Sequence, residues 1–390
     1  MSDEPRKIAV VTGTRAEYGL LKKSMNLIKK DRELDLELFV TGMHLSPRHG
    51  ETYKEIIEDD FEIDYKIDMN MDSGSQITMG KSMGIGIMGF SEGFRHRNPD
   101  MVLVLGDRSE AFAAAVAASH MNIPVGHIAG GQISGGVVID SQVRHAITKL
   151  SHLHFTSTHQ NSKRVRQLGE EDWRIHPVGA TGVDDIDDNN YIPPEEFYRK
   201  YNIPKDQSIA VIIYHPETTN HERAGEQMEK ILRATKENTC YPVIIYPNSD
   251  LGSQHIIAQI NKAGGMWDNY SVYENIERHD FLGLLNIADV MVGNSSSGLI
   301  EAPSFDLPVV NVGDRQSGRQ RAKNVIQVSH DKKKIKEAIR MCLRREGIKK
   351  KAENCENPYF LGGAAEQIKE IIKSISIDES LLRKETVLEL

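Results

Sequence analysis

The stretch MVLVLGDRSEAFAAAVAAS, from Met101 to Ser119, decides the fold class that we predict for this chain. An apolar run is followed by a Gly-Asp-Arg turn and an alanine-rich segment, which is typical of a short buried strand leading into a helix. The same order recurs on both sides, in KIAVV followed by LLKKSMNLIKK and in the later strands IPVGHI and LHFTST. Such repeated units predict a parallel sheet with helices on both faces.

A second series of units begins after a break in the pattern. The break is VGATGVDDIDDNN, residues 178–190, followed by two prolines, and the new strands include SIAVIIYH, YPVIIYPN, DVMVGN and LPVVNVG. A chain of 390 residues also exceeds the size at which one hydrophobic core stops growing. We therefore predict an α/β protein of two Rossmann-like, doubly wound domains, residues 1–182 and 183–365, with ligands in the cleft between the carboxyl ends of the sheets.

The composition is that of a soluble globular protein. Hydrophobic residues make up 39% of the chain, and no segment approaches the roughly 20 apolar residues of a membrane span. The N-terminus lacks the apolar core of a signal peptide, so we expect a cytoplasmic protein. A net charge of -8 argues against broad nucleic-acid binding, which requires a basic face. Cys240, Cys342 and Cys355 form no C-x-x-C pair and are expected to be reduced thiols.

The acidic junction has part of the spacing of a calcium-binding loop. Asp185, Asp187, Asn189 and Glu196 fall at the first, third, fifth and twelfth positions of such a loop. The sixth position is Asn190, where the sharp turn requires glycine, so a solvated hinge is the preferred interpretation. The histidines are scattered and no H-E-x-x-H pattern occurs, so we predict no metal site.

Two turns of the first domain place polar side chains directly after a strand. In GTRAEY, Arg15 follows a glycine turn at the start of a helix, and the backbone N–H groups and guanidinium of such a turn suit a phosphate. In VLGDRSE, Asp107 can orient or move a proton and Arg108 can bind a phosphate. The alternatives are an exposed loop arginine in the first case and an ordinary helix cap in the second.

The glycine-rich stretch GHIAGGQISGGVVIDSQVRHAITK, residues 126–149, has the composition of a loop that lies against a ligand. Between Ile128 and Arg144 it holds a single carboxylate, Asp140. The Gln132 amide can hydrogen-bond a sugar hydroxyl but cannot take up a proton. Asp140 and Arg144 are four residues apart, so an ion pair on the helix surface is an alternative to a role in a site.

Three loops of the second domain carry groups that suit an anion. His215 ends the strand of IYHPETT and can donate to phosphate or act as a general acid, with a buried structural histidine as the alternative. The serines of VGNSSSGLIEAP, among them Ser295, precede a helix whose amides would face an anion, with Glu301 nearly two turns further on. Arg315 follows in NVGDRQSG. Together these groups indicate a nucleoside diphosphate site, in which the carboxylate holds the ribose hydroxyls.

These motifs resemble the UDP-N-acetylglucosamine 2-epimerase family, most closely the hydrolysing branch that releases N-acetylmannosamine for sialic acid synthesis. The resemblance covers about residues 6 to 370 and rests on GTRAEY, LGDR, RHAITKLSHLHF, HPETT, PNSDLGS, GNSSSGLIEAP and NVGDRQSGR. It implies two Rossmann-like domains in the glycosyltransferase-B arrangement, with the active site in the cleft between them, usually as a homodimer. It also implies a C-terminal helix, here within residues 366–390, that returns to the first domain.

The resemblance implies roles for individual residues at the positions that match these motifs. Contacts to the substrate or its diphosphate are implied for Arg15, Arg108, His215, Ser295, Ser296 and Arg315, and a ribose contact for Glu301. Asp107 and Asp140 match carboxylates implicated in the chemistry, and His215 is a further catalytic candidate. Gln132 and Arg144 of the glycine-rich loop are expected to line the sugar pocket.

In the reaction of this family, a proton leaves carbon 2 of the sugar and UDP leaves carbon 1, which forms 2-acetamidoglucal. Hydrolysing members then add water with inversion at carbon 2. The resemblance therefore implies an enzyme that converts UDP-N-acetylglucosamine and water into N-acetylmannosamine and UDP. Elimination and hydration require no hydride acceptor, and the family works without a catalytic metal, so we expect no cofactor.

The glycine-rich loop departs from many members of this family, which carry glutamate where this chain has Ala129 and Gln132. Proton transfer is then expected from Asp107, Asp140 and His215. Four alternatives remain: a UDP- or GDP-linked diacetamido sugar as the substrate, a non-hydrolysing epimerase, a glycosyltransferase of the same fold, and a nucleotide-sugar-binding protein that has lost catalysis.

Overall fold

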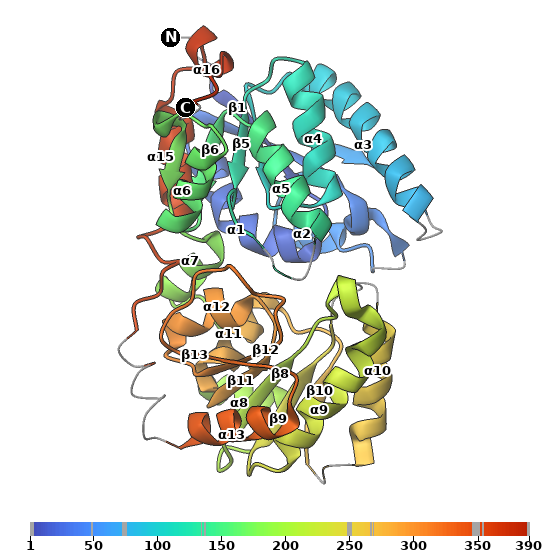
Figure 1. Cartoon of the computed structure of the whole chain (residues 1–390). Helices are drawn as coiled ribbons and strands as arrows, with labels where there is room; N and C mark the ends of the chain where they lie inside the picture. Colours follow the sequence, from blue (N-terminus) through green and yellow to red (C-terminus); the bar gives the residue numbers. More distant parts are fainter. Residues whose placement is uncertain are drawn as a thin grey trace. The chain divides into compact units, whose positions relative to one another are not determined.

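The structure is a computed structural model that describes residues 4–47, 50–71, 76–133, 135, 138–247, 252–265, 267, 269–344, 352 and 355–387. The chain divides into two compact units, each with a central sheet (Figure 1). The first unit contains Met1–Gln132, Ile139–Asp184 and Tyr359–Leu390, and the second contains Ile133–Val138 and Asp185–Pro358. Each unit is therefore assembled from segments that are distant in the sequence.

The first unit contains a parallel sheet of seven strands in the order β3-β2-β1-β4-β5-β6-β7. Its strands are β1 (Arg6–Thr12), β2 (Leu34–Thr41), β3 (Tyr65–Ile67), β4 (Met101–Leu105), β5 (Val125–Ile128), β6 (Leu153–Thr156) and β7 (Ile175–Pro177). Its helices are α1 (Arg15–Lys30), α2 (Tyr53–Glu58), α3 (Gln76–Arg97), α4 (Ser109–His120), α5 (Val138–Leu150), α6 (His159–Gln167), α7 (Thr181–Asp187), α15 (Ala364–Ser374) and α16 (Glu379–Leu382), with short 3-10 turns η1 (Gly42–Leu45) and η3 (Asp172–Arg174).

Burial on both faces of this sheet explains its apolar strands. Along β1, Ile8 and Val10 pack into one core cluster, whereas Ala9 and Val11 pack into another. Successive side chains of a strand point to opposite faces, so a strand that is covered on both sides is apolar throughout. Helices α1 and α15 supply side chains to the first cluster, and α3 and α4 to the second.

Buried polar groups fasten the C-terminal segment to the first unit. The Asp184 carboxylate accepts hydrogen bonds from the N–H groups of Ala364 and Ala365, at 2.9 and 2.7 Å, where α15 begins. The Arg174 guanidinium is fully buried and donates to three carbonyl oxygens within residues 380–383, at 2.7 to 2.9 Å. Because these groups are buried, their hydrogen bonds are costly to break, and they fix the path of the chain after α15.

The second unit contains a parallel sheet of six strands in the order β10-β9-β8-β11-β12-β13. Its strands are β8 (Ile209–Ile213), β9 (Tyr241–Ile245), β10 (Ser271–Tyr273), β11 (Val290–Gly293), β12 (Val309–Val312) and β13 (Val325–Val328). Its helices are α8 (Pro194–Tyr201), α9 (Ala224–Lys236), α10 (Ser253–Lys262), α11 (Arg278–Ile287), α12 (Ser297–Ile300) and α13 (Lys332–Leu343), with 3-10 turns η4 (Thr218–Arg223), η5 (Ala263–Gly265) and η6 (Ala302–Phe305). The prediction of two doubly wound α/β domains is confirmed.

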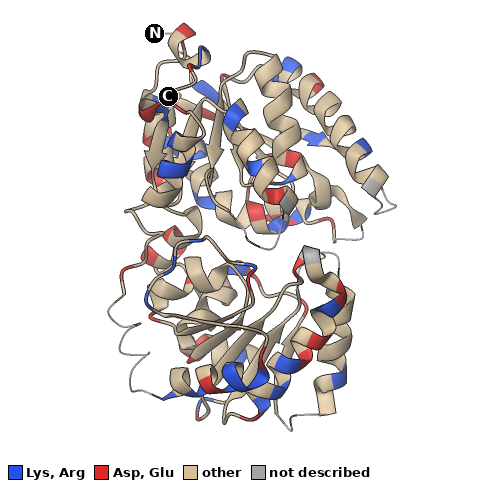
Figure 2. Cartoon of the chain, in the orientation of Figure 1, with Lys and Arg blue, Asp and Glu red and all other residues tan. Residues whose placement is uncertain are grey.

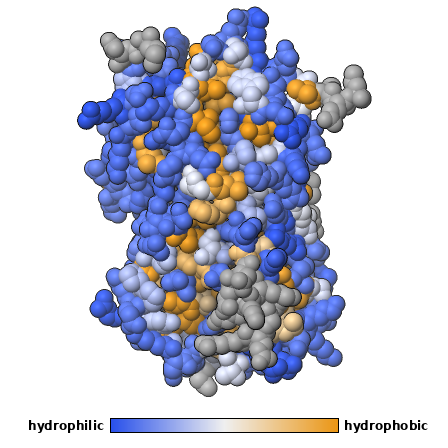
Figure 3. Space-filling model, turned by 90° about the vertical axis from the view of Figure 1, so that its left-hand side faces the viewer, coloured by the Kyte–Doolittle hydropathy of each residue, from blue (hydrophilic) through white to orange (hydrophobic). Residues whose placement is uncertain are grey.

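The surfaces of both units are largely polar. Lys and Arg are interspersed with Asp and Glu along the helices (Figure 2). On the face drawn in Figure 3, hydrophilic side chains cover most of the surface, and hydrophobic ones gather in smaller patches. Among the helices that the structure describes, none is long and apolar enough to cross a membrane.

Candidate active site

Most of the predicted site residues follow the carboxyl end of a strand in their own unit. In the first unit, these are Arg15 after β1, Asp107 and Arg108 after β4, and Gln132 after β5, whereas Asp140 and Arg144 lie on α5. In the second unit, they are His215 after β8, Ser295, Ser296 and Glu301 after β11, and Arg315 after β12. Parallel strands bring such residues to one edge of each sheet, which is where α/β proteins bind ligands.

In the first unit, Arg144 joins the loops that follow β4 and β5. Its guanidinium donates one hydrogen bond to Oδ2 of Asp107 and another, of 2.8 Å, to the carbonyl oxygen of Ala129. The Arg144 side chain is 6% exposed and that of Asp107 is 22% exposed. One carboxylate oxygen of Asp107 is therefore held by a buried partner, while the side chain remains open to solvent.

A buried histidine, His127, forms a hydrogen bond with the loop that contains Asp107. Nε2 of His127 lies 2.8 Å from the carbonyl oxygen of Gly106, which has a φ of +78°. Burial lowers the pKa of His127 to about 3, so the imidazole is neutral at neutral pH. A carbonyl oxygen only accepts hydrogen bonds, so Nε2 carries the proton, and His127 fixes the backbone beside Asp107.

Two carboxylates that the sequence analysis did not single out, those of Glu17 and Glu110, lie against Gly13 in the turn that leads to Arg15. Oε2 of Glu17 accepts a hydrogen bond of 3.0 Å from the N–H of Gly13, and burial raises the pKa of Glu17 to about 7. Glu110 is 3.4 Å from Arg108, and a Cβ at Gly13 would lie 2.7 Å from Cγ of Glu110. The glycine of GTRAEY is thus required by the close approach of Glu110, and Glu110 in turn pairs with Arg108.

The other candidates of the first unit have different neighbours. Arg15 donates from Nε to Oε2 of Glu55 at 2.8 Å. Gln132 is buried, and its amide donates to the hydroxyl of Ser157 at 3.0 Å. Asp140 lies half-buried in the first turn of α5. The structure thus brings Asp107 and Arg144 together directly, whereas the roles of Arg15, Gln132 and Asp140 in a site stay predictions.

In the second unit, Asn294 connects three of the loops that were predicted to bind an anion. The N–H of His215 donates to Oδ1 of Asn294 at 2.7 Å, and Nδ2 of Asn294 donates to the carbonyl oxygen of His215 at 2.9 Å. The carbonyl oxygen of Asn294 accepts hydrogen bonds from Arg315 at 3.2 Å and Gln316 at 2.7 Å. Asn294 is fully buried and directly precedes Ser295, so it fixes these loops with respect to one another.

The imidazole of His215 is neutral at neutral pH. Burial, followed by the nearby Arg315, lowers the pKa of His215 to about 3. A neutral imidazole can still donate one N–H to a phosphate oxygen, but it forms no ion pair with it. The catalytic role of His215 stays a prediction. The neutral imidazole supports a hydrogen bond from His215 to a ligand, not an ion pair.

The helix after the serines is shorter than the sequence suggested. Helix α12 contains only Ser297–Ile300, and the chain continues into the 3-10 turn η6. Pro303 lies in η6, and proline cannot donate the backbone hydrogen bond that a longer α-helix requires. Consequently, Glu301 lies directly after α12 rather than within a continuous helix.

Glu301 has an unsatisfied carboxylate oxygen. Its Oε1 lies 3.6 Å from Nη1 of Arg278, and burial raises the pKa of Glu301, an effect that Arg278 partly offsets. Its Oε2 is buried, and no hydrogen-bond partner reaches it among the residues that the structure describes. A buried carboxylate oxygen without a donor is costly, and a ligand hydroxyl would satisfy it.

The acidic junction gives no sign of the calcium loop. Asp185 forms an ion pair with Arg278, with Oδ2 and Nε 3.0 Å apart, and Asp185 and Asp187 belong to helix α7. Within the described part of the chain, no group of three His, Cys, Asp or Glu residues could hold a metal ion.

Taken within each unit, the two groups of residues suit different chemical tasks. Asp107, oriented by Arg144 and partly exposed, can act as a base. The group around Asn294 presents a neutral histidine, a serine hydroxyl and an arginine, which suit a phosphate. Glu301, later in the same loop, has a buried oxygen that no described residue reaches and that suits a sugar hydroxyl. Sequence reasoning did not single out Asn294, although it lies in the GNSSSG motif. Its role in connecting the loops depends on its complete burial, which the sequence alone does not reveal.

Comparison with known proteins identifies the family. The profile described as UDP-N-acetylglucosamine 2-epimerase matches residues 26–373. The chain is 38% identical to the UDP-N,N'-diacetylbacillosamine 2-epimerase (hydrolyzing) of Legionella pneumophila, over 97% of this chain and 98% of that protein. It is 34% identical to the UDP-N-acetylglucosamine 2-epimerase of Neisseria meningitidis, over 86% of each chain. A crystal structure of UDP-GlcNAc 2-epimerase from Neisseria meningitidis bound to UDP-GlcNAc has a TM-score of 0.81 and 21% identity, over 94% of this chain and 99% of that chain, and shows the same fold. This chain therefore belongs to the UDP-N-acetylglucosamine 2-epimerase family.

Proposed function

We propose that the protein is a hydrolysing 2-epimerase of a UDP-linked 2-acetamido sugar. A base removes the proton from carbon 2, the bond from carbon 1 to the diphosphate oxygen breaks, and UDP leaves with the bond electrons. The resulting 2-acetamidoglucal then takes up water, with the hydroxyl at carbon 1 and the proton at carbon 2. The configuration at carbon 2 is inverted, and the products are the free sugar and UDP.

The observation that carries this proposal is the way in which Asp107 is held. Removal of a weakly acidic proton from carbon requires a base in a fixed position. Arg144 and the Ala129 carbonyl supply that fixed position, and Asp107 remains partly exposed to a substrate. Asp140 is the second candidate for proton transfer, because hydration at carbon 2 needs an acid on the opposite face of the sugar.

The second unit supplies the groups that we assign to UDP. Arg315 and the serines Ser295 and Ser296 would neutralise and hydrogen-bond the diphosphate, which must leave with its negative charge. The unsatisfied Oε2 of Glu301 supports a contact with the ribose hydroxyls. Removal of these groups should mainly weaken UDP binding.

Two sugars are candidates for the substrate. The Legionella pneumophila relative, at 38% identity, is named for UDP-N,N'-diacetylbacillosamine, which favours a diacetamido sugar. The Neisseria meningitidis relative, at 34% identity, is named for UDP-N-acetylglucosamine, which keeps this sugar as the second candidate. With UDP-N-acetylglucosamine the product would be N-acetylmannosamine, and the enzyme would serve sialic acid synthesis.

The proposal includes a homodimer in the cytoplasm that needs no metal and no redox cofactor. Elimination and hydration transfer only protons and water, so no electron carrier takes part. Light scattering of the purified protein would measure the mass of the particle in solution.

The test is proton NMR of reactions in heavy water, with the two UDP sugars side by side. We expect free UDP, an inverted product and deuterium at carbon 2, with the higher kcat/KM for the diacetamido sugar. A UDP-linked epimer without free UDP would identify a non-hydrolysing enzyme, and UDP release without deuterium uptake would identify a transferase or a simple hydrolase. Asp107→Asn and Asp140→Asn should each nearly abolish UDP release, and full activity in both would refute their roles.

A further inference from the structure

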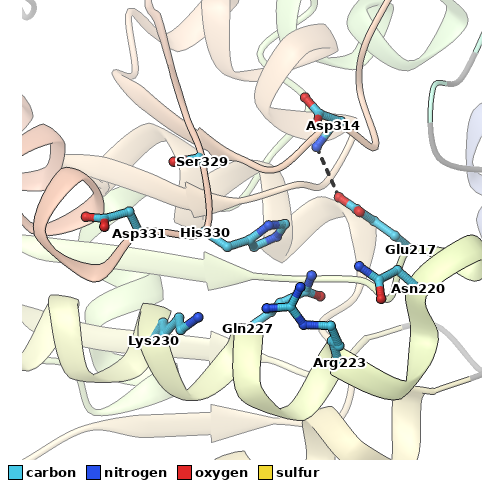
Figure 4. Close-up of a pocket in the computed structure, with 9 residues that line it drawn as sticks. All are labelled: Glu217, Asn220, Arg223, Gln227, Lys230, Asp314, Ser329, His330 and Asp331. Atoms are coloured by element: carbon cyan, nitrogen blue, oxygen red, sulfur yellow. Dashed lines mark hydrogen bonds between the residues drawn. The ribbon is translucent and has the colours of Figure 1, made fainter.

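The loop that follows β12 carries Arg315. At its start, the Gln327 amide donates to the carbonyl oxygen of Gly313 at 2.6 Å, and the N–H of Gly313 donates to the carbonyl oxygen of Val328 at 2.9 Å. After Gly313, the loop is held by two further contacts. At one point, Arg315 and Gln316 both donate to the carbonyl oxygen of Asn294. At the other, the backbone N–H of Asp314 donates to Oε1 of Glu217 at 3.0 Å, as the dashed line in Figure 4 shows. Glu217 belongs to the HPETT motif after β8, so a carboxylate that follows one strand holds the loop that follows another strand.

The contact of Glu217 with this loop is close. Gly313 has a φ of +81°, and a Cβ at this position would lie 2.5 Å both from Oε1 of Glu217 and from Cε1 of His330. His330 is itself fixed, because the Tyr214 hydroxyl lies 2.8 Å from its Nε2 and donates to Oε1 of Gln227 at 2.8 Å. The backbone at Gly313 therefore runs between two side chains that have defined positions.

The other side of Glu217 faces a pocket with a volume of about 390 Å³ (Figure 4). The residues that line this pocket are polar or charged: Glu217, Asn220, Arg223, Gln227, Lys230, Asp314, Ser329, His330 and Asp331. Apolar packing therefore contributes little on this side of the loop, and the hydrogen bond from Asp314 to Glu217 is one of the polar contacts that fix it. Removal of the Glu217 carboxylate would also leave no cavity in the hydrophobic core, so variants at this position should fold.

We propose that Glu217 is a positioning residue, whose carboxylate fixes the loop of Arg315 and thereby sets the affinity for the diphosphate of the nucleotide. The role of Arg315 rests on the proposed function, whereas the anchoring of the loop does not. Glu217 acts through Arg315 and is not assigned a contact with the substrate. Because Arg315 would bind the diphosphate before and during the reaction, its displacement changes binding more than the rate of the bound complex.

The experiment compares Glu217→Ala and Glu217→Gln, with Glu222→Ala as the control. Glu222 is exposed in η4, and its replacement removes the same charge from the same segment. Glutamine keeps an oxygen that can accept from Asp314, so Glu217→Gln should bind UDP as the unmodified protein does. Glu217→Ala should raise the Kd for UDP and the KM about tenfold, with kcat changed less than about twofold. Equal UDP affinities of Glu217→Ala and Glu222→Ala would overturn the proposal.

A double-mutant cycle separates action through Arg315 from an independent effect. If Glu217 acts through Arg315, Glu217→Ala should weaken UDP binding in the unmodified protein but not in an Arg315→Met background. Additive losses of UDP affinity would overturn the proposal, because they would mean that Glu217 acts by another route.

A measurement without nucleotide keeps this inference separate from the proposed function. Hydrogen exchange in the peptide that contains Asp314 and Arg315 should be faster in Glu217→Ala than in Glu217→Gln or Glu222→Ala. If the unmodified protein bound no UDP, the proposed function would fail, and with it the role of Arg315. Unchanged exchange in Glu217→Ala would instead overturn the anchoring by Glu217, whatever the protein binds.

Discussion

Replacement of Glu17 by glutamine is expected to make the stability of the first unit less dependent on pH. Glu17 is 7% exposed and accepts a hydrogen bond of 3.0 Å from the N–H of Gly13, and its pKa is raised from 4.5 to about 7. Burial is the largest cause, and the negative charges of Glu110 and Asp107 add to it, whereas Arg108 opposes it. Glutamine has the same shape and keeps an oxygen for the Gly13 N–H, but it does not ionise.

The sign of the effect follows from proton binding. Below a pH of about 4.5, Glu17 is protonated in both the folded and the unfolded chain, so its ionisation contributes nothing. As the pH rises towards 7, the unfolded chain releases this proton while the folded chain retains it, and the free energy of unfolding falls. The difference in pKa is about 2.5 units, and each unit corresponds to about 1.4 kcal/mol. Above the folded pKa, the cost of the buried charge is therefore about 3.5 kcal/mol.

Urea unfolding of the unmodified protein and Glu17→Gln, between about pH 5 and pH 8, measures this cost. The glutamine variant should gain stability relative to the unmodified protein as the pH rises, by about 2.5 kcal/mol between pH 5 and pH 8, because the unfolded chain already releases part of this proton at pH 5. Glu55→Gln serves as the control, because Glu55 is only half-buried and pairs with the partly exposed Arg15, and such solvent-accessible pairs contribute about 0 to 1 kcal/mol. Parallel pH profiles for the unmodified protein and Glu17→Gln would show that Glu17 is ionised in the folded chain without cost, contrary to this reasoning.

Three further substitutions test the site and the fold. Arg144→Met should slow UDP release about 100-fold with unchanged UDP affinity, because Asp107 loses the partner that orients it, and a matching loss of UDP affinity in calorimetry would contradict this assignment. Gly293→Ala should cost more than about 3 kcal/mol, since its Cβ would lie 1.9 Å from the carbonyl oxygen of Ile213. Gly84→Ala, on helix α3 with no atom within 4 Å of the new Cβ, should instead stabilise the chain by about 0.5 to 1 kcal/mol in thermal unfolding.

The sequence was sufficient to predict where most candidate residues lie along the fold. Asp107, His215 and Arg315 each follow an apolar run of four or five residues, and the structure places these runs in β4, β8 and β12. This information is local, because a short apolar run followed by a glycine or polar turn is characteristic of a buried parallel strand. The roles of these residues are not local properties and stay predictions.

Partners across the sheet were not predictable in the same way. The sequence offered Asp140 as a partner for Arg144, four residues away on one helix, whereas the structure shows Arg144 bound to Asp107, 37 residues away. Glu217 and Asp314 are 97 residues apart and meet because β8 and β12 are both neighbours of β11. Such pairs depend on strand order, and no periodicity in a single sequence specifies strand order.

The glycine-rich loop contributes a backbone carbonyl oxygen to the contacts of Arg144. Ala129 has a φ of 65°, and this left-handed conformation accompanies the hydrogen bond from Arg144 to its carbonyl oxygen. A carbonyl oxygen binds the guanidinium without adding a negative charge, so Asp107 is the carboxylate that receives the other arm of Arg144. The side chain of Ala129 packs against the first core cluster and adds no charge beside Arg144. Asp107 is thus the carboxylate that Arg144 orients, and its role as the base stays a prediction.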